Sequence, residues 1–503
     1  MNSPRQVPAI KLRTGRPSPL AAPELDELVE ANRYWGNPEA ALDNARSLGD
    51  SSTHCVLVGQ QPGLLLGPLF TVYKALGAVR LAAELTAKTG APVVPVFWIA
   101  AEDHDFAEVS DLAYFNSSGA LCSRLLQPEQ PPDGRSIFAV PAAKAMVDYL
   151  WELQSEIRQT EFTADLFERL QAAATASLNL ETFFARLMAG LFGSRGLILA
   201  SPRMKFIRQR GAEIVRQELA HAGESSRLII EAGGADGLLH RRPEDVNVFH
   251  YDADWRRGKI VMDGGNFLVG AGQKPMEREA LLEQLALEPE KFSYNVATRP
   301  VVQDAVFPTA ACLAGPAEVQ YLAQLKGVYR FFGVEQPAIV RRPSAVLIEP
   351  RVLRALQKLG LTAQEFLSMS SEVAQERMAE RADGGTLAVV STAASEVEGI
   401  LTRLKDRLPL TDPAVAKGLE QLSSSSTVGF AKLRERLGRN FTQSDQQRLS
   451  RLQAIEEAVR PFGKRQERVL NIWFPFLNQL GPGLLEKLDE ELHWGEEPAI
   501  IEL

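Results

Sequence analysis

The chain has 503 residues, which is too long for one compact core and predicts two or three structural units. Hydrophobic residues make up 45% of the sequence and charged residues 23%, as in folded globular proteins, which excludes a largely disordered chain. The net charge of −8 argues against non-specific nucleic-acid binding, which depends on basic surface, so no nucleic-acid partner is expected.

The three cysteines, Cys55, Cys122 and Cys312, are far apart in the sequence and form no CxxC pair. A disulfide framework and a cysteine zinc cluster are therefore not expected. The N-terminal segment has no apolar core of a signal peptide, and no apolar run approaches the ~18–20 residues of a membrane span. These features predict a cytoplasmic protein without a membrane partner.

The first elements predict the class of the fold. Residues 1–50 are expected to form an N-terminal arm with short helices. The apolar run from His54 to Val58 predicts a buried strand, and the helical periodicity from Pro68 to Lys88 predicts a helix that ends at Gly90. Residues 93–99 predict a second buried strand. Strand, helix and strand in this order indicate a βαβ unit and an α/β core with a parallel sheet.

Residues 51–350 are expected to complete this core with inserted connecting segments. The further elements are an exposed loop over 126–136, two or three helices over 142–191, a strand over 196–200, a helix over 206–222, short strands over 240–267 with a turn at Gly264-Gly265, mixed α/β structure over 301–336 and a strand over 338–348.

The composition becomes helical after Pro350, and residues 351–467 are predicted to form an α-helical coiled-coil arm. One reading is a long hairpin that projects from the core, and the alternative is a bundle packed on it. Residues 468–503 are expected to be a helical docking segment. Two apolar stripes and one helix cap support the prediction: Val397, Leu401, Leu404 and Leu408; Leu452, Ile455, Val459 and Phe462; and the cap Thr411-Asp412-Pro413.

The first candidate site is the turn after the first strand, Gly59-Gln60-Gln61-Pro62-Gly63. Ligands of open α/β sheets bind beyond the carboxyl ends of the strands, and glycines let a ligand approach the backbone. The turn matches neither a dinucleotide-binding GxGxxG motif nor a P-loop. The alternative is an ordinary strand-to-helix turn.

The second candidate site is Glu102-Asp103-His104-Asp105, directly after the second strand. Four titratable groups behind a buried strand indicate the mouth of a site, and His104 oriented by Asp103 or Asp105 fits a general base. One alternative is a metal site, and another is a charged turn in which Asp105 caps the next helix. Both candidate sites follow neighbouring strands, so one cleft is expected to contain them.

A third candidate site contains Asn295, Arg299 and Asp304. Arg299 suits a carboxylate or phosphate, and Asp304 suits an amine or hydroxyl, although an Arg299–Asp304 structural pair is an equal alternative. Lys74 is a further candidate for a phosphate, or else is solvated. Residues 464–468 either bind the phosphates of a nucleotide or begin a helix.

Several of these segments resemble the signature blocks of the bacillithiol biosynthesis cysteine-adding enzymes, the cysteine ligase family. The blocks are GQQPGLLLGPLFTVYKA, PVFWIAAEDHDFAEV, RPVVQDAVFPT, AGPAEVQYLAQLK and GKRQERVLN. Their order and spacing match from about residue 50 to the C-terminus. Three positions depart from the family pattern: Ala317 replaces a glycine, Arg465 replaces a proline, and no acidic residue lies near Ala200 and Ser201.

The resemblance implies a Rossmann-like core with inserted connecting segments and a coiled coil that forms a homodimer. It implies an enzyme, a ligase that joins the carboxyl of L-cysteine to the amine of glucosaminyl malate in the last step of bacillithiol synthesis. It also implies an adenine nucleotide (ATP or ADP), with Mg²⁺ accompanying it, away from the core cleft; no structural metal is expected. The alternatives are a nucleotidylyl transferase acting in the same cleft and a non-catalytic scaffold.

Under this resemblance each candidate residue receives a role. The catalytic candidates are His104, Asp103 and Asp105, of which His104 is the base. The substrate-binding candidates are Gln60, Gln61 and Asn295 for sugar hydroxyls, Gly63 for the backbone turn, Lys74 and Arg299 for carboxylates or a phosphate, and Asp304 for an amine or hydroxyl. The nucleotide-binding candidates are Lys464, Gln466 and Arg468.

Overall fold

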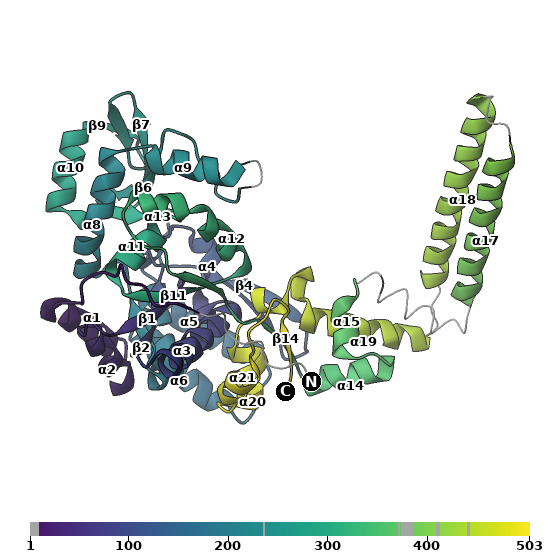
Figure 1. Ribbon diagram of the computed structural model, residues 1–503. Coiled ribbons are helices and arrows are strands. Elements are labelled where there is room, and N and C mark those ends of the chain that lie inside the picture. Colours follow the sequence, from purple (N-terminus) through teal and green to yellow (C-terminus); the bar gives the residue numbers. More distant parts are fainter. Residues whose placement is uncertain (1–9, 235–236, 371–372, 374–385, 409–412, 440–442) are drawn as a thin grey trace. The chain divides into compact units, whose positions relative to one another are not determined.

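The computed structural model describes residues 10–234, 237–370, 373, 386–408, 413–439 and 443–503 (Figure 1). The chain divides into two compact units. The first unit comprises Met1–Ala345 and Glu467–Ala499, and the second comprises Val346–Gln466 and Ile500–Leu503.

A five-stranded parallel sheet forms the centre of the first unit. Its order is β12-β11-β1-β2-β5, and each pair of neighbours is parallel. The chain adds β2 and β5 on one side of β1 and returns to add β11 and β12 on the other side. The carboxyl ends of β1 and β11 therefore form the topological switch point, where open α/β sheets bind ligands. The strands are β1 (His54–Gln60), β2 (Val93–Ile99), β5 (Ile198–Ala200), β11 (Thr309–Ala314) and β12 (Ala338–Arg341).

The predicted βαβ unit is confirmed. Helix α3 (Phe70–Thr89) connects β1 to β2, and Gly90 ends it in the left-handed conformation with φ 72°. The predicted single strand over 338–348 is wrong, because it is two strands in different sheets, β12 and β13 (Ala345–Ile348). Pro343 lies between them and lacks the N–H that a continuous ladder requires.

Helices surround this sheet, and β3 and β4 form a separate antiparallel hairpin in the same unit. The predicted helices over 142–191 are confirmed as three. The bounds are α1 (Ala22–Tyr34), α2 (Glu39–Ser47), α4 (Phe106–Ser110), β3 (Asp111–Phe115), β4 (Leu121–Leu125), α5 (Ala143–Glu156), α6 (Thr163–Thr175), α7 (Leu180–Phe192), α8 (Lys205–Ala220), α9 (Glu224–Gly233), α10 (Arg278–Leu287), α11 (Thr298–Val306), α12 (Pro316–Gln324), α13 (Lys326–Phe331), α20 (Asn478–Leu480) and α21 (Leu484–Glu491).

A second sheet of five antiparallel strands is inserted between β5 and β11, in the order β10-β6-β7-β8-β9. The short strands and the turn at Gly264-Gly265 are confirmed, but the sequence did not indicate that they form one sheet with β9 and β10. The strands are β6 (Asp245–Tyr251), β7 (Arg257–Asp263), β8 (Asn266–Val269), β9 (Lys274–Met276) and β10 (Phe292–Tyr294).

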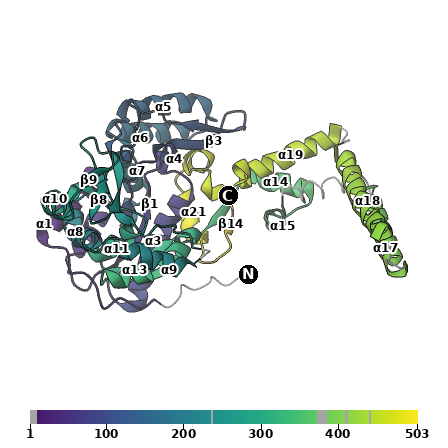
Figure 2. The same ribbon diagram turned by 90° about the horizontal axis from the view of Figure 1, so that it is seen from above.

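The second unit is mainly helical. Helices α17 (Thr386–Arg407) and α18 (Pro413–Arg439) pack side by side as a hairpin (Figures 1 and 2). Helix α19 (Gln443–Val459) packs instead against α14 (Pro350–Leu359), with α15 (Ala363–Ser368) nearby in the same apolar core. The hairpin is confirmed, but the two predicted apolar stripes belong to different helix pairs.

Two details of these stripes are wrong. Leu408 lies beyond the end of α17, and Phe462 is exposed in a turn beyond α19, with a positive φ of 52°. Leu452, Ile455 and Val459 are buried, as the pattern predicts. The predicted cap residues Thr411 and Asp412 lie outside the described residues, and Pro413 is the first residue of α18.

The C-terminal segment is only partly helical. It contains a π-helical turn, Trp473–Leu477, and the helices α20 and α21, but it ends in the strand β14 (Ala499–Glu502), which pairs with β13. The prediction of a helical end is therefore wrong. Among the described residues, no helix combines the length and apolar composition that a membrane crossing requires.

Candidate active site

A cleft of about 590 Å³ lies between the carboxyl ends of the parallel strands and the inserted antiparallel sheet. The parallel-sheet side contributes Gly59, Gln60, Gln61, Ala100, Glu102, Asp103, His104, Glu108, Glu318 and Tyr321. The inserted segment contributes Arg241, Asp245, Val246, Phe249, Arg257, Lys259, Ile260, Tyr294, Asn295 and Val296, and Arg299 follows on α11. The structure thus brings the first two predicted sites into one cleft, together with Asn295 and Arg299 of the third.

Asp103 is the centre of a polar network in this cleft. Its carboxylate accepts hydrogen bonds from Gln61 Nε2 at 2.7 Å and from the His104 backbone N–H at 2.8 Å. The Arg257 guanidinium lies 3.5 Å away. Burial favours the neutral acid, but His104, Arg257 and Gln61 together hold the pKa of Asp103 well below its usual range. Asp103 is therefore ionised at neutral pH.

His104 lies beside this fixed carboxylate. Its Nδ1 is 3.4 Å from Asp103 Oδ1, and 45% of the side chain is exposed. A carboxylate at one ring nitrogen orients the imidazole and leaves the other nitrogen for a proton in the cleft. The geometry suits the predicted general base, and Asp103 is the carboxylate that orients it.

Asp105 has a different place. Its Oδ1 accepts a hydrogen bond from the Glu108 backbone N–H at 3.1 Å and caps α4. The alternative interpretation of this motif, a helix cap, is therefore confirmed for Asp105. The alternative of a metal site gains no ligand set, because the described part of the chain contains no group of three or more His, Cys, Asp and Glu side chains placed to hold a metal ion.

Glu102 and Arg208 form a buried ion pair beneath the cleft. Their charged atoms are 2.6 Å apart, and both side chains are at most 6% exposed. Arg208, on α8, also donates to the Phe292 carbonyl and lies over the Tyr294 ring, both in β10. Burial would lower the pKa of Arg208, but Glu102 beside it raises that pKa above the usual range. The pair joins the two sheets, and the sequence did not single out Arg208.

Lys74 lies behind the cleft rather than in it. Its buried ammonium donates to Gly59 O at 2.8 Å and Gln60 Oε1 at 3.1 Å, and it pairs with Glu318 Oε2 at 2.7 Å. Burial lowers the pKa of Lys74, although Glu318 opposes the shift. All three ammonium hydrogens have protein partners, so this residue holds the turn after β1 against the start of α12.

Gly63 also has a structural place. A Cβ at this position would lie 2.9 Å from Gly67 Cα, so any larger residue would force the two segments of the turn apart. The leucines that follow it, Leu65 and Leu66, have positive φ angles of 51° and 68°. The close turn therefore requires the glycine irrespective of any ligand.

The members of the third predicted site separate. Arg299 lines the cleft and donates to Tyr321 Oη at 2.9 Å, while Asn295 donates to Asn247 Oδ1 at 2.9 Å. Asp304 is buried elsewhere and accepts from Tyr329 Oη at 2.5 Å. Both Arg299 and Asp304 are described, and no ion pair joins them, so the alternative of a structural Arg–Asp pair is wrong.

The predicted nucleotide ligands differ in exposure. Lys464 and Arg468 are exposed, whereas Gln466 is buried. The Gln466 amide accepts from Leu347 N at 2.8 Å and donates to the carbonyls of Leu347 at 2.9 Å and Ala458 at 2.8 Å. Both amide hydrogens are used within the second unit, so Gln466 does not fit a nucleotide ligand.

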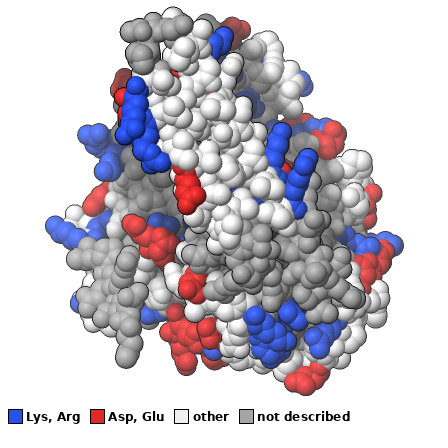
Figure 3. All heavy atoms as spheres, turned by 90° about the vertical axis from the view of Figure 1, so that its right-hand side faces the viewer, with Lys and Arg blue, Asp and Glu red and all other residues white. Residues whose placement is uncertain are grey.

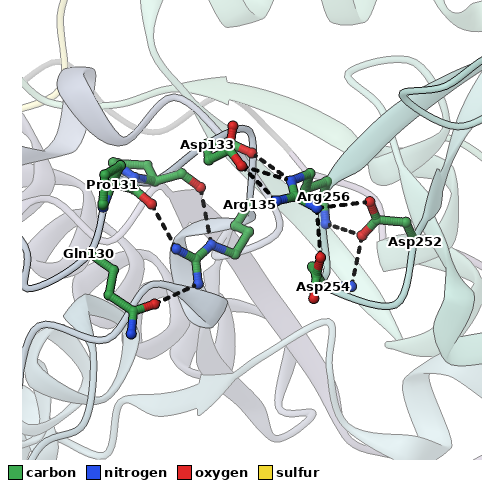
Figure 4. A network of polar contacts seen from close by, with 8 residues as sticks. Gln130, Pro131, Asp133, Arg135, Asp252, Asp254 and Arg256 are labelled. Atoms are coloured by element: carbon green, nitrogen blue, oxygen red, sulfur yellow. Dashed lines mark hydrogen bonds and ion pairs between the residues drawn. The ribbon is translucent and has the colours of Figure 1, made fainter.

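A loop connects the two walls of the cleft, and Figure 4 shows its outer contacts. Arg256 Nη2 lies 2.6 Å from Asp133 Oδ2, and Arg257 N donates to Gly134 O at 3.1 Å. Further along the loop, the buried Ser136 hydroxyl donates to Glu102 O at 2.6 Å, and Ile137 N donates to Asp103 O at 2.7 Å. The segment expected as a plain exposed loop thus holds the Glu102–Asp103 turn beside the β6–β7 hairpin.

The sequence pattern did not indicate the cationic residues of the inserted segment. Arg241, Arg257 and Lys259 line the cleft, but they lie in a segment whose pattern predicts only short strands. Their spacing matches no phosphate or carboxylate motif. Glu318 and Tyr321 lie within the block AGPAEVQYLAQLK, which resembles the family pattern, so the sequence does offer an indication that they are near the site.

Comparison with known proteins finds family models that match nearly the whole chain. A family model described as "Bacillithiol biosynthesis BshC, N-terminal Rossmann-like domain" matches residues 16–343, and its companion, the "C-terminal coiled-coil domain", matches residues 345–497. The chain belongs to the BshC family. The resemblance, the Rossmann-like core and the helical C-terminal part are therefore confirmed.

Curated relatives of the BshC family match over nearly their full length. A relative from Chlorobaculum tepidum is 32% identical over 499 residues, covering 95% of this chain and 88% of its own. One from Salinibacter ruber is 30% identical over 474 residues, covering 93% and 86%. Both are named "Putative cysteine ligase BshC". The family membership makes the chain an enzyme of bacillithiol biosynthesis.

Proposed function

We propose that this chain joins the carboxyl of L-cysteine to the amine of glucosaminyl malate and so forms bacillithiol, the last step of the pathway. The observation that carries the proposal is His104, held by an ionised Asp103 in the cleft at the carboxyl end of β2. Membership of the BshC family supports the cysteine ligase reaction, because its curated members bear that name.

In this mechanism His104 accepts the proton from the sugar amine as its nitrogen attacks the cysteine carbonyl carbon. The C–N bond forms while the C–O bond to the leaving group breaks, and that group is a phosphate or AMP that a nucleotide cosubstrate has transferred to the cysteine carboxyl. Asp103 stabilises the imidazolium that results. Gln60 lines the cleft, and its Oε1 accepts from Lys74. Its Nε2 amide group is the part that suits a sugar hydroxyl.

We propose that an adenine nucleotide with Mg²⁺ binds away from the core cleft. Lys464, exposed in the second unit, is a proposed residue for its phosphates, Arg468, exposed in the first unit, is a separate candidate, and Gln466 does not fit because its amide is already satisfied. The proposal for these two residues rests on their exposed positive charge alone.

The test is product formation from glucosaminyl malate and cysteine, measured by mass spectrometry with and without ATP and Mg²⁺. We expect His104→Ala to lower the rate at least ~100-fold at an unchanged melting temperature, because a general base contributes about this much. His493→Ala removes another exposed histidine, outside the cleft, and is the matched control. Full activity of His104→Ala would refute the proposed base, and release of pyrophosphate with an adenylated sugar would favour nucleotidylyl transfer.

We also propose that the enzyme is a homodimer formed through the α17–α18 hairpin. Each helix carries an outward apolar stripe with steps of 4, 7 or 11 residues, which return to the same face of a helix. The stripes are Val389, Ile400 and Leu404 on α17, and Val415, Leu422 and Leu433 on α18, all at least 40% exposed. In Figure 3 the face of the molecule turned to the viewer has a largely uncharged area with Lys and Arg side chains at its margins.

Light scattering coupled to size-exclusion chromatography tests the dimer. We expect Leu422→Asp with Leu433→Asp to yield a monomer, because two buried charges oppose association. Ser424 lies about 180° around the same helix from Leu433, so the control Ser424→Asp should stay dimeric. A monomeric wild type, or a dimeric double variant, would contradict the proposal.

A further inference from the structure

The charges that line the cleft do not balance one another. Four of the five carboxylates there pair with a cation, Glu102 with Arg208, Asp103 with Arg257, Asp245 with Arg242 and Glu318 with Lys74, and Glu108 accepts a hydrogen bond from the neutral amide of Gln61. Three cations, Arg241, Lys259 and Arg299, have no carboxylate within 4.0 Å among the residues that the structure describes. The cleft therefore has unmatched positive charge at its surface.

Hydrogen bonds connect Arg241 and Arg299 to two asparagines, Asn247 and Asn295, that are bonded to each other. Arg241 Nε donates to Asn247 Oδ1 at 2.8 Å, and Asn295 donates to that oxygen at 2.9 Å. Arg299 lies one helical turn after Asn295, and its backbone N–H donates to Asn295 O at 2.9 Å. Asn247 thus links Arg241 to Asn295, and both guanidinium groups donate to protein acceptors, His240 O for Arg241 and Tyr321 Oη for Arg299.

The donors of Arg299 are incompletely used. Its Nε is buried and has no hydrogen-bond partner, although its Nη2 donates to Tyr321. An unsatisfied buried donor is costly, and an anion in the cleft would remove the cost. Lys259 is exposed on β7, directly opposite Phe249 of β6, and adds a mobile positive charge on the same wall.

We propose that Arg241, Lys259 and Arg299 form an anion subsite that binds the two carboxylates of the malyl group of the sugar substrate. This inference rests on the proposed function and specifies the site that recognises the substrate. Two planar guanidinium groups suit carboxylates, which accept two parallel hydrogen bonds. In glucosaminyl malate the amine and the malyl group are on neighbouring ring carbons. Carboxylates on the cationic wall would therefore leave the amine free to meet His104.

Calorimetric binding without cysteine or ATP tests the subsite separately from catalysis. The ligands are glucosaminyl malate, malate, inorganic phosphate and the methyl glycoside of glucosamine, which lacks carboxylates. We expect Arg241→Gln and Lys259→Ala each to weaken binding of glucosaminyl malate about tenfold, as loss of a charge-assisted hydrogen bond does. Binding of the methyl glycoside should not change. Lys274→Ala, an exposed lysine of the same sheet outside the cleft, is the matched control.

The outcomes separate the two proposals. Wild-type affinity for glucosaminyl malate and malate in both variants would overturn the subsite, as would weaker binding of phosphate alone, because the anion would then be a phosphoryl group. His104→Ala should bind glucosaminyl malate like the wild type. If binding depends on Arg241 and Lys259 but the wild type forms no product, the subsite stands and the ligase reaction fails. Lys259 is exposed, so Lys259→Ala provides the decisive result if Arg241→Gln does not fold.

Discussion

The two walls of the cleft satisfy their charges in opposite ways. On the parallel-sheet wall the ionised groups are held by neighbours, as Asp103 is by Gln61, His104 and Arg257. On the wall of the inserted sheet, Arg241 and Lys259 have no carboxylate partner among the described residues. A fixed group keeps its geometry during a reaction, whereas an unmatched charge gains most of its stabilisation when a ligand arrives. The difference separates a wall suited to chemistry from a wall suited to recognition.

Arg208 is the residue that connects the walls, so its removal has the largest expected effect on stability. Arg208→Ala leaves Glu102 as a buried charge without its cation and removes the bond to Phe292. Loss of one partner of a buried pair costs about 3–5 kcal/mol. We expect the free energy of unfolding, measured by urea denaturation, to fall by this amount.

Arg216→Ala is the control for this experiment. Arg216 lies on the same helix and pairs with Glu213 in solvent, with both side chains more than half exposed. Its removal should leave the denaturation midpoint nearly unchanged. Equal losses in the two variants would show that the buried pair does not hold the walls together.

Asp304 offers the next largest effect and extends the comparison to a buried carboxyl outside the cleft, which accepts from Tyr329 and has the Arg13 guanidinium at its backbone carbonyl. Burial raises the pKa of Asp304 to about 6. The folded state therefore binds this proton more tightly than the unfolded chain, where the pKa is about 3.9. The stabilisation is complete below about pH 4 and is lost as the pH rises through about 6.

Asp304→Asn cannot ionise and should not lose this stabilisation. We expect the free energy of unfolding of the variant, relative to the wild type, to rise by about 2–3 kcal/mol between pH 4 and pH 7. Urea denaturation at several pH values measures the difference. Asp165→Asn, at an exposed position of α6, controls for the substitution itself. A constant difference between variant and wild type across this range would contradict the effect of burial.

The two walls also differ in how well the sequence predicts their cleft residues. The parallel strands are short apolar runs, and their polar ends follow directly, so the Gln60–Gln61 turn and residues 102–105 could be placed in one cleft. The inserted sheet draws its strands from 50 residues between Asp245 and Tyr294, and its pairing depends on contacts that no local pattern encodes. Arg241 and Lys259 were therefore missed.

Burial explains the residues that were predicted for the cleft but lie outside it. Lys74 and Asp304 have the residue types of ligand-binding groups, and local periodicity places them on helices beside the site. Only the three-dimensional packing reveals that Glu318 and Tyr329 already satisfy them. A buried polar group must be paired wherever it lies, so residue type alone does not distinguish a ligand contact from an internal one.

The smallest expected effect concerns Arg256, which fastens the loop between the walls to the β6–β7 hairpin (Figure 4). Its ion pairs with Asp133 and Asp254 lie in solvent, so Arg256→Ala should hardly change the denaturation midpoint. The loop, however, loses its ion pair at Asp133, two residues before Arg135, and we expect faster trypsin cleavage after Arg135, measured by mass spectrometry of timed digests. The KM for the sugar should rise severalfold at nearly constant kcat, because the backbone of Arg257 is fastened to the same loop. Unchanged cleavage and KM would mean that the hydrogen bonds of Ser136 to Glu102 and of Ile137 to Asp103 are sufficient to hold the loop in place.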